Sequence, residues 1–158
     1  MKSIPFLSVS GSHFECGRQV GAVFKEQIFR YRDLCKAEPP EKSTYEECLK
    51  EIHKFIEPTQ KYFPEVVDEI RGVAEGCGMD FVEVFFQGVD EFYSSSFPVR
   101  GCTDIVTLPP ASTHTLVAHN NDLPPNYYGC LTAIEWNFDD GSQMFSIGLG
   151  FMVSVAIN

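Results

Sequence analysis

The chain has 158 residues, of which 44% are hydrophobic and 13% aromatic. This length and composition suit one compact globular domain with a substantial core. The 22 acidic residues outnumber the 12 basic ones, giving a formal net charge of -10. Because no Lys/Arg run is present to neutralise a phosphate backbone, nucleic acid is excluded as an expected partner.

The N-terminal apolar stretch, from Ile4 to Val9, contains Pro5 and is shorter than the core of a signal peptide. No other stretch approaches the length of a membrane span, and no Asn-x-Ser/Thr acceptor site occurs. We therefore expect a cytoplasmic protein with no membrane partner.

The six cysteines are spaced at long and irregular intervals, at positions 16, 35, 48, 77, 102 and 130. This spacing favours free thiols in a reducing compartment over a disulfide framework. No Cys-x-x-Cys pair occurs, and His114 and His119 lack the spacing of zinc ligands. We expect no metal site and no cofactor.

The first hundred residues have helical patterns and the last sixty have strand patterns, so the fold class is expected to be α+β. A short strand is predicted over residues 3 to 10. Ser12 is placed to cap a helix whose apolar face runs from Phe14 to Leu34. Gly17 and Gly21 lie four residues apart on this helix, which predicts the close approach of another backbone.

Three further helices are predicted before residue 101. Ser43 and Glu46 form a capping signature for a helix that extends to about Tyr62. A helix over residues 64 to 75 starts at a proline and is expected to stop at Gly76 and Gly78. Asp80 with Glu83 is expected to cap a short, buried helix over residues 81 to 90.

From residue 102 onward, the spacing of the hydrophobic residues is typical of β-strands. Residues 103–108 and 115–120 are predicted to form one hairpin, and residues 131–138 and 143–149 a second hairpin around an Asp-Asp-Gly turn. The run from 151 to 157 is a further apolar strand. Residues 1–101 are thus the predicted helical part and residues 102–158 the predicted antiparallel strands, whose open edge invites pairing with another chain.

Cys102 lies in the sequence Arg-Gly-Cys-Thr, where the helical part gives way to the strands. One interpretation is that it is a half-buried strand cysteine that acts as a small hydrophobe. The alternative interpretation makes it a nucleophile, and it depends on three motifs in a fixed order along the chain.

The first motif, Gly-Ser-His-Phe-Glu-Cys-Gly, spans residues 11–17 and is followed by Gly21. The second includes Glu-Ile-Arg-Gly-Val-Ala-Glu-Gly at residues 69–76. The third is Gly101-Cys102-Thr103 with His-Asn-Asn-Asp downstream at 119–122. Together these motifs resemble the amino-terminal half of the isopenicillin N acyltransferase family of N-terminal-nucleophile hydrolases.

The resemblance implies an αββα sandwich, here apparently incomplete, and a precursor zymogen that cleaves itself between Gly101 and Cys102. The would-be α subunit is residues 1–101, and Cys102 becomes the first residue of the β subunit. Its thiol would attack an N-acyl amide while its freed α-amino group carries the proton, giving an S-acyl enzyme. The substrate partner would be a small N-acyl molecule.

Other site residues follow from the same resemblance. Asp122 is expected to orient the amine of the nucleophile or to assist processing, although a turn aspartate before the following prolines is equally compatible. Asn120 or Asn121 could polarise the carbonyl or cap a loop. Asp104 departs from the fungal enzyme, which has a hydroxyl residue there, so Asp104 is expected to affect substrate contacts or the processing rate.

An acyl pocket could be lined by His119 and by aromatic side chains that include Tyr93, although a histidine satisfied at a strand end and a packed aromatic core are the better default interpretations. The remaining candidates for this wall are Phe85, Phe86 and Phe92. Family members are about twice as long, so the chain is interpreted as a gene fragment, a subunit completed by a C-terminal half or in a homo-oligomer, or a degenerate relative. A non-catalytic scaffold and a hydrolase of bile-salt-like or N-acyl lipid amides are the rival functions.

Overall fold

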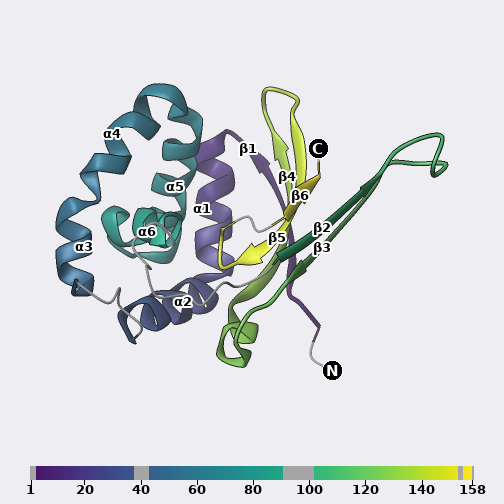
Figure 1. Cartoon of the computed structure of the whole chain (residues 1–158). Helices are drawn as coiled ribbons and strands as arrows, with labels where there is room; N and C mark the ends of the chain where they lie inside the picture. Colours follow the sequence, from purple (N-terminus) through teal and green to yellow (C-terminus); the bar gives the residue numbers. More distant parts are fainter. Residues whose placement is uncertain (1–2, 38–42, 91–101, 153–154, 158) are drawn as a thin grey trace.

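The computed structural model describes residues 3–37, 43–90, 102–152 and 155–157, with helices on one side and a sheet on the other (Figure 1). The α+β class expected from the sequence is therefore present. The helices are α1 (His13–Val23), α2 (Lys25–Ala37), α3 (Tyr45–Glu51), α4 (His53–Tyr62), α5 (Pro64–Cys77) and α6 (Phe81–Gln87). None of the helices in these ranges is long and apolar enough to cross a membrane.

The strands are β1 (Phe6–Gly11), β2 (Cys102–Thr107), β3 (Leu116–Asn121), β4 (Leu131–Phe138), β5 (Gln143–Leu149) and β6 (Val155–Ile157). They form a four-stranded sheet in the order β1-β4-β5-β6 and a separate two-stranded sheet of β2 and β3. β4 is parallel to β1 and antiparallel to β5. The N-terminal strand thus completes a sheet whose other members all follow residue 130.

Helices α1 and α5 pack with their backbones in direct contact. A Cβ added to Gly17 would overlap the carbonyl oxygen of Glu69, and one added to Gly72 would overlap that of Phe14. Gly21 and Gly76 make equivalent contacts one turn further along each helix. The predicted close approach at Gly17 and Gly21 is confirmed, because only a residue without a side chain fits there.

Several helix predictions were wrong in their boundaries. The long helix from residue 13 is divided at Phe24, whose backbone leaves the helical region (φ -98°, ψ 22°). The capping box lies one residue later than expected, with Thr44 as the cap and Glu47 as its partner. The later start directs Tyr45 and Cys48 into the core, where both are buried.

Of the two predicted stop signals of α5, one is confirmed and the other is wrong. Gly78 has a positive φ of 72° and ends the helix as expected. Gly76 was also expected to stop it, but Gly76 lies inside α5 and contacts α1 instead.

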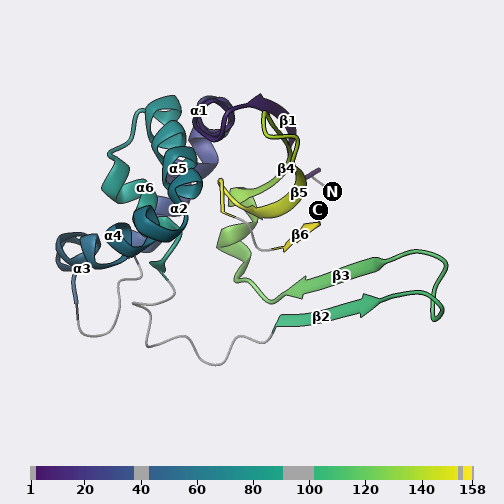
Figure 2. The ribbon, with the colours of Figure 1, turned by 90° about the horizontal axis from the view of Figure 1, so that it is seen from above.

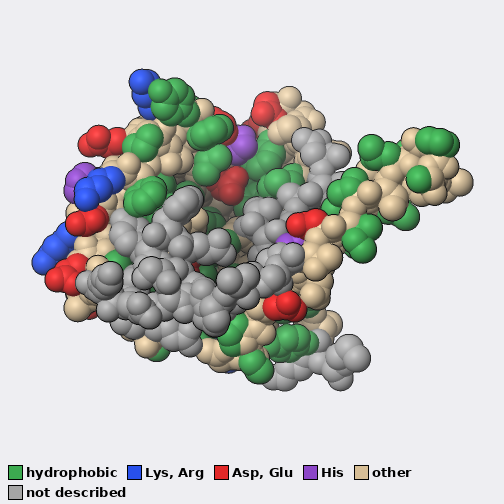
Figure 3. All heavy atoms as spheres, in the orientation of Figure 1, with side chains coloured by type: hydrophobic (Ala, Val, Ile, Leu, Met, Phe, Trp, Pro, Cys, Tyr) green, Lys and Arg blue, Asp and Glu red, His purple; other side chains and the backbone are tan. Residues whose placement is uncertain are grey.

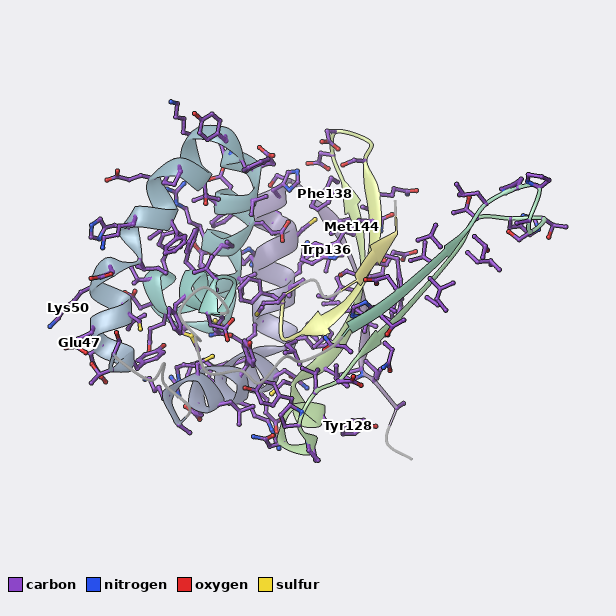
Figure 4. All side chains as sticks on the ribbon, viewed as in Figure 1. Glu47, Lys50, Tyr128, Trp136, Phe138 and Met144 are labelled. Carbon is purple, nitrogen blue, oxygen red and sulfur yellow. The ribbon has the colours of Figure 1, made fainter. Side chains whose placement is uncertain are left out.

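The core lies between the helices and one face of the four-stranded sheet. Trp136, Phe138 and Met144 extend from β4 and β5 into the space beside α1 (Figure 4). The Trp136 indole Nε1 donates to Ser146 Oγ at 2.8 Å, which satisfies a buried polar group. The helices therefore hold the sheet from one side only among the described residues.

The hairpin of β2 and β3 extends away from the helices (Figures 1 and 2). Its strands agree with the predicted hairpin to within a residue, and it pairs with no other described strand. Hydrophobic side chains lie along it at the molecular surface (Figure 3). Four of the large apolar ones are more than half exposed: Ile105, Val106, Leu108 and Leu116.

Candidate functional site

The register of β2 and β3 determines which of the expected site residues share a face. Cys102 is paired with Asn121, Thr103 with Asn120, and Asp104 with His119. Because side chains alternate along a strand, positions 102, 104, 119 and 121 fall on one face of the hairpin and positions 103 and 120 on the other. For Cys102 the structure describes the backbone only.

Asp104 and His119 form a close polar pair across the two strands. The Asp104 carboxylate oxygen Oδ1 lies 2.6 Å from His119 Nδ1. The carboxylate accepts, so the proton of this hydrogen bond is on Nδ1 and the ring is held in one orientation. Asp104 is 66% exposed in its side chain, whereas His119 is 12% exposed.

The second ring nitrogen of His119, Nε2, is buried and has no hydrogen-bond partner among the described residues. With Nδ1 protonated, a neutral imidazole presents a lone pair at Nε2. A buried acceptor without a donor is costly, and such groups recur at catalytic sites. His119 is thus oriented by Asp104 and left with an unused basic atom.

A pocket of about 330 Å³ lies at the base of the hairpin, where β3 leads into the 3₁₀ helix η2 (Pro125–Cys130). Its polar lining comes from His119, Asn121 and Tyr128, of which Tyr128 belongs to η2 and is labelled in Figure 4. The rest of the lining is apolar or lacks a side chain: Leu123, Pro124, Pro125, Leu131, Ile147 and Gly148. A concave, mainly apolar surface with a few polar groups is typical of a small-molecule site.

Asn120 and Asp122 do not line this pocket. Asn120 Nδ2 donates to Asp122 Oδ1 at 3.1 Å, and both residues are exposed. Asn120 lies on the opposite face of the hairpin from His119. Of the two asparagines considered at the sequence level, Asn121 is the one beside the pocket.

The remaining candidates separate into two groups. Gly101, Phe92 and Tyr93 lie outside the described residues. Phe85 and Phe86 are buried in the helical core, where Phe86 packs edge-on against Tyr45 with 5.2 Å between ring centroids. These two phenylalanines therefore pack in the core and do not line the pocket.

Sequence reasoning missed most of the apolar lining. Leu131, Ile147 and Gly148 belong to β4 and β5, and Tyr128 belongs to a 3₁₀ helix that no pattern indicated. The two prolines at 124 and 125 were noted only as a turn. They are the one local signal that could have marked this wall.

A second cluster of ionisable groups lies away from the pocket, between α1, α5 and the sheet. Burial raises the pKa of the Glu69 carboxyl to about 7, and His13 Nδ1 is 3.6 Å from Glu69 Oε2. The His13 ring stacks on Phe138 with 3.9 Å between centroids. Burial, with the nearby Glu69 carboxylate, also raises the pKa of the Cys16 thiol to about 11. Near neutral pH Cys16 is therefore a neutral thiol, and the Glu69 carboxyl is partly protonated.

The cysteines outside the candidate site are buried and unreactive. The cysteines at 16, 35, 48, 77 and 130 are buried and unpaired, as expected for free thiols. Burial is the first cause of a raised pKa at each of them. None of these five therefore has the depressed pKa that activates a cysteine nucleophile.

A scan of the chain against protein-family models finds no match, and no curated protein matches its sequence. Function is therefore argued from the motifs and from the site itself. Chemically, the site offers an oriented imidazole, an amide and a phenol beside an apolar pocket, with a cysteine position on the same hairpin face as the imidazole.

Proposed function

We propose that the chain is an autoprocessing cysteine amidohydrolase or acyltransferase of the N-terminal-nucleophile type. It cleaves itself between Gly101 and Cys102 and then acts on the amide bond of a small N-acyl substrate through an S-acyl enzyme. The observation that carries the proposal is the register of β2, whose first residue is Cys102 and whose partner there is the pocket-lining Asn121. A new amino terminus formed at Cys102 would therefore begin at the pocket.

The proposed chemistry divides between one cysteine and the pocket beside it. The Cys102 thiol attacks the acyl carbonyl, and the freed α-amino group takes its proton and returns it to the leaving amine. The Asn121 amide is suited to donate to the carbonyl oxygen as negative charge develops on it. The apolar wall of the pocket accepts the acyl group, and its volume of about 330 Å³ favours a small or medium one.

Asp122 is proposed to act on the amine of Cys102 or in processing, after the strand end has adjusted. In the uncut chain its Oδ1 accepts from Asn120 and it is exposed. Cleavage before Cys102 would free the end of β2 beside it, which gives Asp122 a cationic amine to pair with.

The proposed fold is the αββα sandwich of the family. The helices and the sheet of β1, β4, β5 and β6 would be one α and one β layer. A second β layer, from a C-terminal half or from another copy, would cover the sheet face that carries Phe6 and Phe145, which are 59% and 39% exposed. The two rings stack on each other with centroids 6.4 Å apart.

The test is intact mass spectrometry of the purified protein after incubation near neutral pH. Wild type is expected to yield one fragment that ends at Gly101 and one that starts at Cys102, whereas Cys102→Ala stays whole. Cys48→Ala removes a buried thiol of the helical part and serves as the matched control, which should be cleaved like wild type. Wild type that remains at full mass while correctly folded contradicts the proposal.

A second candidate is a scaffold that pairs through the hairpin. The exposed apolar residues of β2 and β3 favour it, because such an arm is prone to pair with another chain. A scaffold does not need the Gly101–Cys102 bond to break, so the mass measurement also separates these two functions.

A further inference from the structure

Self-cleavage requires a base that the proposed amine mechanism cannot supply. Before the bond breaks, the nitrogen of Cys102 is an amide, whose lone pair is delocalised into the carbonyl and does not accept a proton. The α-amino group that serves the mature enzyme does not yet exist. The first turnover on the chain itself therefore needs another proton acceptor near position 102.

His119 is the imidazole that the described residues place on this hairpin face. Its Nδ1 is bonded to Asp104 at 2.6 Å, while Nε2 is buried without a partner among the described residues. This is the arrangement of an imidazole base oriented by a carboxylate. The Asp122 carboxylate, three residues after His119, accepts from Asn120 instead.

The register brings His119 within reach of position 102. Asp104 is directly opposite His119, and Cys102 is two residues before Asp104 on the same strand face. Diagonal neighbours across an antiparallel pair are about 7–8 Å apart between Cα atoms, close enough for a long side chain to bridge. Positions 102 and 119 therefore fall on the same face of the hairpin.

We propose that His119, oriented by Asp104, is the general base that activates the Cys102 thiol for self-cleavage in the uncut chain. This inference rests on the proposed function and assigns one of its steps. It also gives Asp104 a role as a positioning residue, which acts through His119.

In this step the imidazole carries one proton from the thiol to the leaving nitrogen, and water is the only co-reactant. Nε2 takes the proton from the Cys102 thiol, and the thiolate sulfur bonds to the carbonyl carbon of Gly101. The carbon–nitrogen bond to Cys102 breaks as the nitrogen receives the proton from the imidazolium, leaving a thioester and an α-amine. Water then attacks the thioester, which releases the Gly101 carboxyl group and restores the thiol.

The experiment measures the rate of the 101–102 cleavage by intact mass in the full chain, for wild type and four variants. Cys102→Ala is expected to be inert, and His119→Ala to be slowed by about 100-fold or more, as for loss of a general base. Asp104→Ala is expected to be slowed at least about tenfold, because the imidazole loses its orienting partner. The matched control is His114→Ala, at the far end of the same hairpin, with an unchanged rate.

Added imidazole separates a catalytic role of His119 from a structural one, because it would not restore cleavage if His119 only held the fold. It should restore cleavage to His119→Ala, whereas pyrazole, a ring of the same size and far weaker basicity, should not. Because Asp104 is 66% exposed, Asp104→Ala keeps the fold and tests the inference even where His119→Ala does not fold.

The outcomes separate this inference from the function on which it rests. Cleavage of wild type with unchanged rates in Asp104→Ala and in folded His119→Ala overturns the role of His119 and leaves the proposed function standing. Slow cleavage of both variants, with His119→Ala rescued by imidazole and not by pyrazole, supports the role of His119. Folded wild type that never cleaves contradicts the proposed function and this inference with it.

Discussion

Gly72 of α5 lies against the carbonyl oxygen of Phe14 in α1, with no room for a Cβ between them. Gly17 of α1 makes the reciprocal contact with Glu69 of α5. These contacts place two of the sequence motifs side by side. Phe14 and Gly17 belong to the first motif, residues 11–17, and Glu69 and Gly72 belong to the second, residues 69–76. The glycines of these motifs are therefore explained by the packing of two helices.

Gly72→Ala is expected to lower the free energy of unfolding by about 3 kcal/mol, since the two helices must separate to admit the methyl group. Urea unfolding followed by circular dichroism measures it. Gly88→Ala is the control, because its Cβ would meet the Phe85 carbonyl at an ordinary 3.4 Å. Equal stabilities of the two variants would show that the helices adjust without strain.

Glu69 should make stability depend on pH. Its pKa is raised from 4.5 to about 7 by burial, so the folded protein favours the neutral carboxyl. Stability from this group is greatest below about pH 4.5 and is lost as the pH rises through 7, by about 3 kcal/mol at about 1.4 kcal/mol per pKa unit. Glu69→Gln should therefore match wild type near pH 5 and exceed it near pH 8.

The measurement is urea unfolding of both proteins at several values from pH 5 to pH 8. Glu75→Gln, which changes an exposed carboxyl on the same helix, is the control and should keep the wild-type pH dependence. His13, 3.6 Å from Glu69, is retained in every protein compared. The same slope in Glu69→Gln as in wild type would assign the pH dependence to another group.

Removing the hydrogen bond between Tyr31 and Asp90 is expected to destabilise the fold. The Tyr31 hydroxyl donates to Asp90 Oδ2 at 2.9 Å, and Tyr31 is only 3% exposed. Tyr31→Phe deprives a partly buried carboxyl of this donor and should lower the free energy of unfolding by about 1–3 kcal/mol. Thermal unfolding checks it against Tyr62→Phe, whose ring is 65% exposed and whose change should be negligible.

Local patterns predicted the hairpins better than the helices. The β4 and β5 boundaries agree with the expected residues because alternation and the turn at Gly141, with φ of 88°, point to the same register. At the start of α3, both Ser43 and Thr44 can cap, and each is followed three residues later by a glutamate. Burial of Tyr45 and Cys48 selects the second, and burial is a tertiary property.

The site was predictable only in part, for a related reason. Cys102, His119 and Asn121 could be named from motifs, but the Asp104–His119 pair depends on a cross-strand register. The pocket adds residues from β4 and β5 that carry no local sign of a shared site. Parallel pairing of β1 with β4, separated by more than a hundred residues, likewise has no local sequence signal.

Thiol labelling should single out one cysteine of the six. Raised pKa values leave little thiolate near neutral pH at the five buried cysteines, of which Cys16 and Cys130 reach about 11. Under the proposed function, Cys102 is the activated thiol, so iodoacetamide at pH 7.5 should modify it at least about tenfold faster than the others. Peptide mapping by mass spectrometry measures the six rates, and labelling in denaturant, where burial is lost, should make them nearly equal. Preferential labelling of one of the five buried cysteines in the folded protein would contradict the assignment of Cys102 as the reactive thiol.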